Sequence, residues 1–193
     1  MRFEPAALQG IWIIQSDRNE DERGYFMRAF SAPEFEEQGL PQRFVQASIS
    51  GNFRRGTVRG LHFQWPPSRE GKLVRCVTGA IYDVAVDLRP DSATFLQHCA
   101  VELSEQNARA VYIPEGFAHG FQVREDGTRV LYQMTDVFEP SLSAGFSYND
   151  PVFDVRWPQA VTVVSARDRD APPFDAARYR VEFGQRASRA HRE

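Results

Sequence analysis

The sequence is short of cysteine, of excess positive charge and of long apolar runs, and each shortage removes a class of protein. Two cysteines, Cys76 and Cys99, are too few for a disulfide scaffold and do not form a Cys-x-x-Cys pair. No run approaches the roughly 18 apolar residues of a membrane span, and the N-terminal segment lacks the apolar core of a secretory signal. The formal net charge of −3 argues against a nucleic-acid partner. These absences predict a cytoplasmic protein, with no membrane or nucleic-acid partner, that acts on a small molecule.

Motifs of several enzyme classes are also missing. Neither Gly-x-Ser-x-Gly nor Gly-x-x-x-x-Gly-Lys occurs, which disfavours a serine hydrolase and a P-loop enzyme. His62 is followed by Phe63 and Gln64, so the His-x-His of many metal sites is absent, and the cationic Lys72 nearby would repel a divalent ion. Cys76 lies in a predicted strand, where burial is a more common role than nucleophilic attack. A metal-dependent oxygenase therefore stays only as an alternative, which metal analysis would expose.

Helical signals are few, and the remaining pattern is that of strands. We expect short helices at 31–39, where Ser31 precedes a proline and several glutamates, and at 175–180. In 80–88, apolar residues alternate with Asp83 and Asp87, which predicts a strand with two carboxylates on one face. Further strands are predicted at 10–15, 24–30, 43–49, 58–64, 73–78, 94–103, 110–113, 118–123, 129–137 and 161–164.

Many short strands with so little helix predict an all-β protein, a sandwich or barrel. The 193 residues fit one domain, predicted at 1–183. The segment 184–193 is polar and poor in apolar residues, so we expect a flexible C-terminal tail.

The densest polar cluster on a predicted strand spans 59–64. Alternation places Leu61 and Phe63 on one face of this strand and His62 and Gln64 on the other. A lone histidine in a strand is usually a polar residue with satisfied hydrogen bonds. The residues around this cluster therefore decide whether it forms a site.

Several cationic and proton-transfer residues lie on neighbouring predicted strands. Lys72 is at the start of the strand after His62, and His119 follows a turn at 114–118. Directing two histidines, Lys72 and Arg59 into one barrel mouth is costly without a ligand or partners. His62 and Tyr132 can both transfer protons, and Lys72 can stabilise an oxyanion. General acid–base catalysis therefore fits these residues best.

Several segments in order resemble one known family. They are RGLHFQ (59–64), KLV (72–74), YDVAVDLR (82–89), IPEGFAHGF (113–121), NDP (149–151), WP (157–158) and SARD (165–168). Together they resemble the dTDP-4-dehydrorhamnose 3,5-epimerase family. The resemblance begins near 21–26 and extends to about 174, so it covers most of the chain.

This resemblance implies a cupin-type β-barrel or jelly roll with a few short helices, forming a homodimer without metal or cofactor. The implied substrate is a nucleotide-linked 4-keto-6-deoxyhexose, inverted at C3 and C5 next to its ketone. The general base corresponds to His62, oriented by the carboxylate of Asp168. Tyr132 corresponds to the acid that returns a proton on the opposite face, and Lys72 faces the enolate oxygen.

The resemblance also implies a set of substrate-binding residues. Arg23 and Arg59 correspond to residues that hold the diphosphate, where paired guanidinium donors are favourable. Asp83 is expected to hold His119, which matches a substrate contact. The other implied substrate contacts are Phe26, Arg28, Gln46, Ser48, Lys72, Phe138, Ser143 and Arg167. The departures from the family pattern are Arg28 and Ser143 in place of Glu, Ser48 in place of Asn, Arg167 in place of Lys and Phe138 in place of Tyr.

The arginine at position 28 leaves open which nucleotide base the protein recognises. A guanidinium offers only donors, so it cannot accept a hydrogen bond from thymine N3–H, whereas cytosine or guanine acceptors would suit it. The alternative is that Arg28 points toward phosphate or solvent. Two rival functions remain: a mono-epimerase acting on a CDP- or GDP-linked 4-keto sugar, and a non-catalytic nucleotide-sugar-binding cupin.

Overall fold

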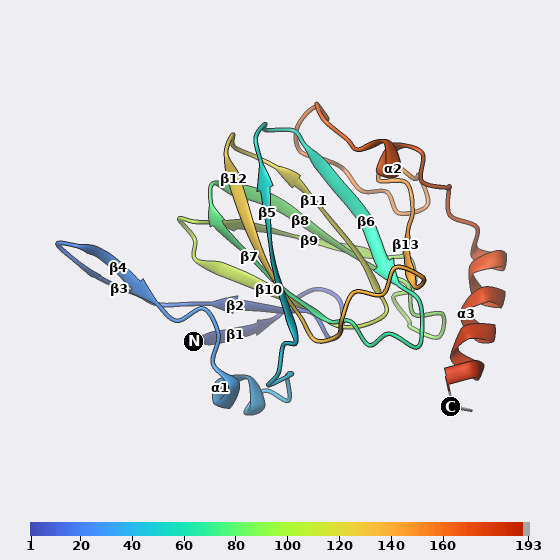
Figure 1. Cartoon of the computed structure of the whole chain (residues 1–193), viewed down its shortest axis with the longest axis horizontal. Helices are drawn as coiled ribbons and strands as arrows, with labels where there is room; N and C mark the ends of the chain where they lie inside the picture. Colours follow the sequence, from blue (N-terminus) through green and yellow to red (C-terminus); the bar gives the residue numbers. More distant parts are fainter. Residues whose placement is uncertain (191–193) are drawn as a thin grey trace.

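Two antiparallel sheets face each other in the computed structural model, which describes residues 1–190 (Figure 1). In spatial order, the six-stranded sheet contains β1 (Arg2–Pro5), β2 (Trp12–Gln15), β10 (Arg109–Ile113), β7 (Lys72–Thr78), β12 (Thr128–Met134) and β5 (Gln46–Asn52). The five-stranded sheet contains β13 (Ser143–Gly145), β6 (Val58–Gln64), β11 (Phe117–Val123), β8 (Ala80–Asp87) and β9 (His98–Ser104). The mostly-β, cupin-like prediction is confirmed, although no ladder among the described residues closes the two sheets into a continuous barrel.

The remaining elements of residues 1–190 are one hairpin and three helices. The hairpin, which we call the arm, consists of β3 (Arg18–Asp21) and β4 (Gly24–Met27) and extends away from both sheets (Figure 1). The helices are α1 (Ala32–Glu36), α2 (Ala166–Arg169) and α3 (Ala176–Ala190). No helix among the described residues is long and apolar enough to cross a membrane.

Alternation along the strands divides the apolar side chains between three clusters. Val74 and Phe121 belong to the cluster between the sheets, where the site also lies. Leu61 and Phe63 turn to the outer face of the five-stranded sheet and pack against Tyr179 of α3. The outer face of the six-stranded sheet packs against α1 through the third cluster. Polar residues that alternate with the outward-facing apolar ones, such as His62 between Leu61 and Phe63, therefore face the interior between the sheets.

Some sequence-based predictions were wrong, each for an identifiable reason. No strand forms at 161–164, where Val163 makes only an isolated bridge to Thr57. The polar strand β3 was missed because the arm is almost wholly exposed and its sequence has no apolar alternation. The segment 184–193 was expected to be a flexible tail, but it is helical as far as Ala190. Helix α3 continues well past the helix expected at 175–180. Residues 191–193 lie outside the described part of the chain.

Candidate active site

The first element of the site is a histidine–carboxylate pair. Asp168 Oδ1 lies 2.7 Å from His62 Nε2, and Asp168 Oδ2 accepts a hydrogen bond from the Gly60 backbone N–H at 3.2 Å. His62 is partly exposed on the inner face of β6, as alternation predicted, whereas Asp168 is buried. With Nε2 turned to the carboxylate, Nδ1 of His62 is the nitrogen left to act as a base.

Helix α2 presents Asp168 to the histidine. The Ser165 hydroxyl caps this helix by accepting a hydrogen bond from the Asp168 N–H at 3.1 Å. Burial by itself would raise the pKa of Asp168, but hydrogen bonds and the charge of His62 outweigh it and hold the pKa below its ordinary value. The carboxylate therefore stays ionised, as a group that orients an imidazole and stabilises its protonated form must be.

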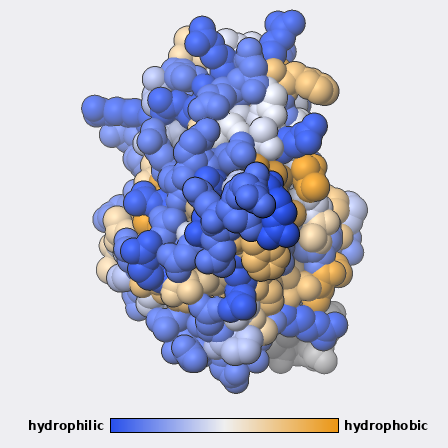
Figure 2. All heavy atoms as spheres, turned by 90° about the vertical axis from the view of Figure 1, so that its left-hand side faces the viewer, coloured by the Kyte–Doolittle hydropathy of each residue, from blue (hydrophilic) through white to orange (hydrophobic). Residues whose placement is uncertain are grey.

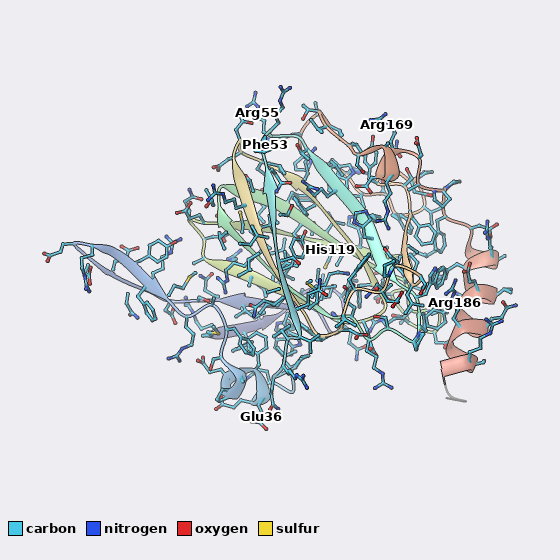
Figure 3. All side chains as sticks on the ribbon, viewed as in Figure 1. Glu36, Phe53, Arg55, His119, Arg169 and Arg186 are labelled. Carbon is cyan, nitrogen blue, oxygen red and sulfur yellow. The ribbon has the colours of Figure 1, made fainter. Side chains whose placement is uncertain are left out.

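A second histidine–carboxylate pair lies deeper between the sheets. His119 Nε2 is 2.7 Å from Asp83 Oδ2, and both side chains are buried. His119 on β11 is the direct cross-strand partner of His62 on β6, and Figure 3 shows it between the two sheets. The two strands approach each other closely here: a Cβ added to Gly60 would lie only 2.6 Å from the Gly120 Cα. Asp83 was expected to hold His119, and the geometry places it there.

Tyr132 joins this cluster from the opposite sheet. Its ring meets that of His119 edge-on, with centroids 5.7 Å apart. Burial raises the pKa of Tyr132 well above its ordinary value, the carboxylate of Asp83 raises it further, and the charge of Arg59 opposes them. The phenol is therefore neutral at physiological pH and able to donate a proton. His119 lies beside both His62 and Tyr132, so the two proton-transfer side chains share one site.

Lys72 and Arg59 are each held by a residue that the sequence analysis did not select. Lys72 Nζ lies 2.7 Å from Glu70 Oε2, and both side chains are largely buried. Arg59 Nε donates to Oδ1 of the buried Asn52 at 2.7 Å. Neither partner belongs to a recognisable motif, since each contact depends on how the strands and loops pack.

Two polar contacts join four of the predicted substrate-binding residues, Gln46, Phe138, Ser143 and Arg167, which we call the rim. Gln46 Oε1 accepts a hydrogen bond from the backbone N–H of Phe138 at 3.0 Å, and about half of the Phe138 side chain is exposed. Arg167 Nη2 donates to the Ser143 hydroxyl at 2.8 Å. Ser48 is paired with Tyr132 in the β5–β12 ladder. The four rim residues and Ser48 are thus brought near the site, as predicted.

A cavity of about 340 Å³ opens beside the histidine–carboxylate pair, and His62, Ser143, Arg167 and Asp168 are among the residues that line it. Gln64 was left out of the predicted site, yet it supports the rim. Its amide donates to Val137 O and its carbonyl accepts from the Glu139 N–H. Ser165 was also missed, although Ser-x-x-Asp before a helix is a capping signal.

Three predicted substrate contacts do not reach the site within one chain. Arg23, Phe26 and Arg28 lie on or next to the arm, which points away from both sheets (Figure 1). Arg23 pairs with Asp21 of the arm itself, and Phe26 is 75% exposed. Arg28 Nη1 lies 3.1 Å from Oε1 of Glu34 on α1. If these residues bind the substrate, they must do so in another copy of the chain.

The described residues contain no group of three or more His, Cys, Asp or Glu side chains arranged to hold a metal ion. Each site histidine already has a carboxylate partner at 2.7 Å. The donor set is thus arranged as two hydrogen-bonded pairs. Metal independence stays a prediction of the sequence.

Comparison with known proteins identifies relatives across nearly the whole chain. Residues 5–176 match the family model for dTDP-4-dehydrorhamnose 3,5-epimerase. An enzyme of that name from Methanothermobacter thermautotrophicus is 43% identical, over 90% of this chain and 94% of the relative. A dTDP-4-dehydrorhamnose 3-epimerase from Streptomyces niveus is 37% identical, over 89% and 83% of the two chains. A Legionella pneumophila dTDP-6-deoxy-D-glucose-3,5-epimerase, solved with dTDP-4-keto-L-rhamnose, superposes with a TM-score of 0.84 and 37% identity, covering 89% of this chain and 92% of that one.

Two facing antiparallel sheets around a histidine–aspartate pair and a neutral tyrosine define a cupin-type isomerase. More specifically, the chain belongs to the dTDP-4-dehydrorhamnose 3,5-epimerase family.

Proposed function

We propose that this protein inverts C3 and C5 of a dTDP-linked 4-keto-6-deoxyhexose by general acid–base catalysis. The observation that carries the proposal is the pairing of His62 with the buried, ionised Asp168, one neighbouring side chain away from the neutral phenol of Tyr132. Simple binding of a sugar needs no such acid–base pair, which argues against a non-catalytic cupin. The names of the relatives support the same substrate class.

In the proposed mechanism, His62 removes the proton next to the ketone. Nδ1 takes the C3 proton, and Asp168 stabilises the imidazolium that forms. The electron pair left behind moves onto the ketone oxygen and gives an enolate. The ammonium of Lys72 stabilises that oxygen, with Glu70 keeping the lysine side chain in place.

Tyr132 then delivers a proton to the opposite face of the same carbon. Its hydroxyl loses a proton as the C–H bond forms, the ketone is restored and the centre is inverted. The charge of Arg59, which lowers the pKa of Tyr132 against the effect of burial, stabilises the transient phenolate. Proton exchange with solvent resets both side chains before the same steps take place at C5.

We infer that the protein works as a homodimer in which each arm completes the site of the other subunit. The arm carries Arg23 and the exposed Phe26, a cation for the diphosphate and a ring for stacking. The outer face of β5 also exposes apolar surface, including Ile49, which is 70% exposed. Figure 2 looks at the molecule from the side of the arm and shows apolar surface next to its polar tip. Such a face favours pairing with a second copy.

The two cysteines are free and buried, which fits the reducing cytoplasm proposed as the location. The runner-up function is inversion of one centre only. The 3-epimerase among the relatives supports that candidate. It would need the same His62 and Tyr132 but a substrate pose that exposes one carbon to them.

Proton NMR in D₂O with dTDP-4-keto-6-deoxyglucose tests the proposal and separates these candidates. We expect deuterium at both C3 and C5 and formation of the inverted sugar. Deuterium at a single carbon would identify a mono-epimerase. Absence of uptake from the dTDP-, CDP- and GDP-linked sugars would leave only a binding function.

A further inference from the structure

Arg75 is a buried cation that the proposed chemistry does not use. Its neighbours Val74 and Cys76 point into the cluster between the sheets, so the Arg75 side chain lies on the outer face of β7. It is only 3% exposed. Taking a guanidinium out of water is unfavourable unless its donors are matched by acceptors. The acceptors around Arg75 therefore indicate its role.

Those acceptors are neutral. Nη1 donates to the carbonyl of Ala108 at 2.8 Å and lies 3.8 Å from Met27 Sδ, while Nη2 donates to Ser16 Oγ at 2.9 Å and to the carbonyl of Ala29 at 3.4 Å. No carboxylate among residues 1–190 forms an ion pair with it. Burial lowers the pKa of Arg75 to about 10, so the side chain is still charged at neutral pH.

The position of these acceptors in the chain is specific. Ser16 lies two residues before the arm, Met27 is its last residue, and Ala29 lies two residues after it. The Arg75 side chain thus contacts both ends of the arm. The same guanidinium also donates to the carbonyl of Ala108, in the turn before β10.

Beyond its two ends, where Arg28 also pairs with Glu34 of α1, the arm has little to fix its direction. None of its eight strand residues is buried. The guanidinium of Arg18 lies over the Tyr25 ring at 4.2 Å, but this contact is internal to the arm. The angle at which the arm leaves the sheet therefore depends on the residues at its root.

We propose that Arg75 is a positioning residue that fixes the arm so that Arg23 and Phe26 meet the nucleotide end of the substrate in the partner subunit. The inference rests on the proposed exchange of arms in a homodimer. A planar guanidinium suits this task because it presents several donors in fixed directions to two chain segments at once, which an ammonium cannot do.

The test compares Arg75→Met and Arg75→Lys with the wild type. Arg109→Met serves as the matched control, since Arg109 lies on the neighbouring strand, is exposed and contacts Gln15. The first measurement is hydrogen exchange along the whole chain. Both Arg75 variants should exchange at least about tenfold faster within residues 16–29 and like the wild type in the two sheets. Arg75→Lys retains the charge, so it still tests the inference if Arg75→Met loses its global fold.

The second measurement is steady-state kinetics on the nucleotide sugar. We expect KM to rise about tenfold in both variants and kcat to change by less than about twofold, because binding is impaired and proton transfer is not. Unchanged hydrogen exchange at 16–29 would overturn the inference, and so would a fall in kcat with unchanged KM. A wild type that is monomeric or inactive would instead refute the proposed function, so the two failures are distinguishable.

Discussion

At the scale of single residues, the site consists of groups whose protonation states are set by their surroundings. The hydrogen bonds to Asp168 and the charge of His62 keep that carboxylate ionised although burial opposes ionisation. Burial and the negative charge of Asp83 keep Tyr132 neutral. An ionised carboxylate that orients His62 and a phenol that can donate a proton are thereby present in one site, and the proposed roles of His62 and Tyr132 each lead to a prediction.

Replacing His62 by alanine should abolish exchange of the C3 proton without unfolding the protein. His62 is partly exposed, so little packing is lost, whereas losing a general base costs roughly 10²–10⁴ in rate. Deuterium uptake by NMR gives the rate and thermal unfolding gives the stability. His98→Ala is the control, because His98 bonds to the Phe153 carbonyl outside the site. Near-normal uptake in His62→Ala would remove this residue from the mechanism.

Replacing Tyr132 by phenylalanine should slow inversion far more than the initial proton exchange. Removal of the proton needs His62, whereas delivery on the far face needs the phenol. Comparing deuterium uptake with product formation in one NMR time course measures both steps, with Tyr112→Phe as the control for loss of a buried hydroxyl. Equal falls in the two rates would contradict the division of roles.

Tyr132 also determines the alkaline limit of activity. An ordinary tyrosine loses its proton near pH 10, and a raised pKa moves that loss to higher pH. Ionisation of Tyr132 should therefore cause no decline of kcat below about pH 10. A decline centred below that pH, seen in the wild type and absent from the residual turnover of Tyr132→Phe, would show that the phenol is not held neutral.

At the scale of elements, the proposed role of the arm assigns nucleotide binding and proton transfer to different parts of the chain. Arg23→Ala should weaken binding of dTDP, CDP and GDP alike, by about 10- to 150-fold, since it removes a charged hydrogen bond to the diphosphate. Arg28 is paired with Glu34, so Arg28→Ala should change dTDP binding by less than about threefold. Calorimetric titration of the three nucleotides into both variants and the wild type makes the comparison. A wild type that prefers CDP or GDP, and loses that preference in Arg28→Ala, would mean that Arg28 contacts the base.

At the scale of the whole molecule, activity should depend on the pairing of two chains. Analytical ultracentrifugation of the wild type should give twice the 22.0 kDa mass of one chain. Ile49→Lys places a charge in the exposed apolar face of β5 and should produce monomers with little activity. Val181→Lys on α3 is the control, because Val181 is also exposed but lies on the helix at the far side of the five-stranded sheet. A fully active monomer would contradict the exchanged arm.

The sequence by itself determined the type of structure and the chemical groups of the site. Strict alternation in 80–88 separates Val84 and Val86 from Asp83, since successive side chains of a strand point to opposite faces. The same rule turned His62 inward and Phe63 outward. The motifs between 59 and 168 also indicated the family, because they occur together and in the same order along the chain.

Only the tertiary structure decided which distant residues are in contact and which segments are exposed to solvent. The family resemblance named Asp168 as the partner of His62, but the two residues are 106 positions apart and no local pattern specifies the packing that brings them to 2.7 Å. The support of Lys72 by Glu70 and of Arg59 by Asn52 likewise depends on burial, which removes competing water. In the polar segment after 183, the helix is supported by Arg186, which pairs with Glu182 one turn earlier and lies over the ring of Trp65, the residue that follows β6. Strand β3 of the arm has no apolar alternation for the opposite reason, since no other part of residues 1–190 buries the arm and only its root is fixed by packing.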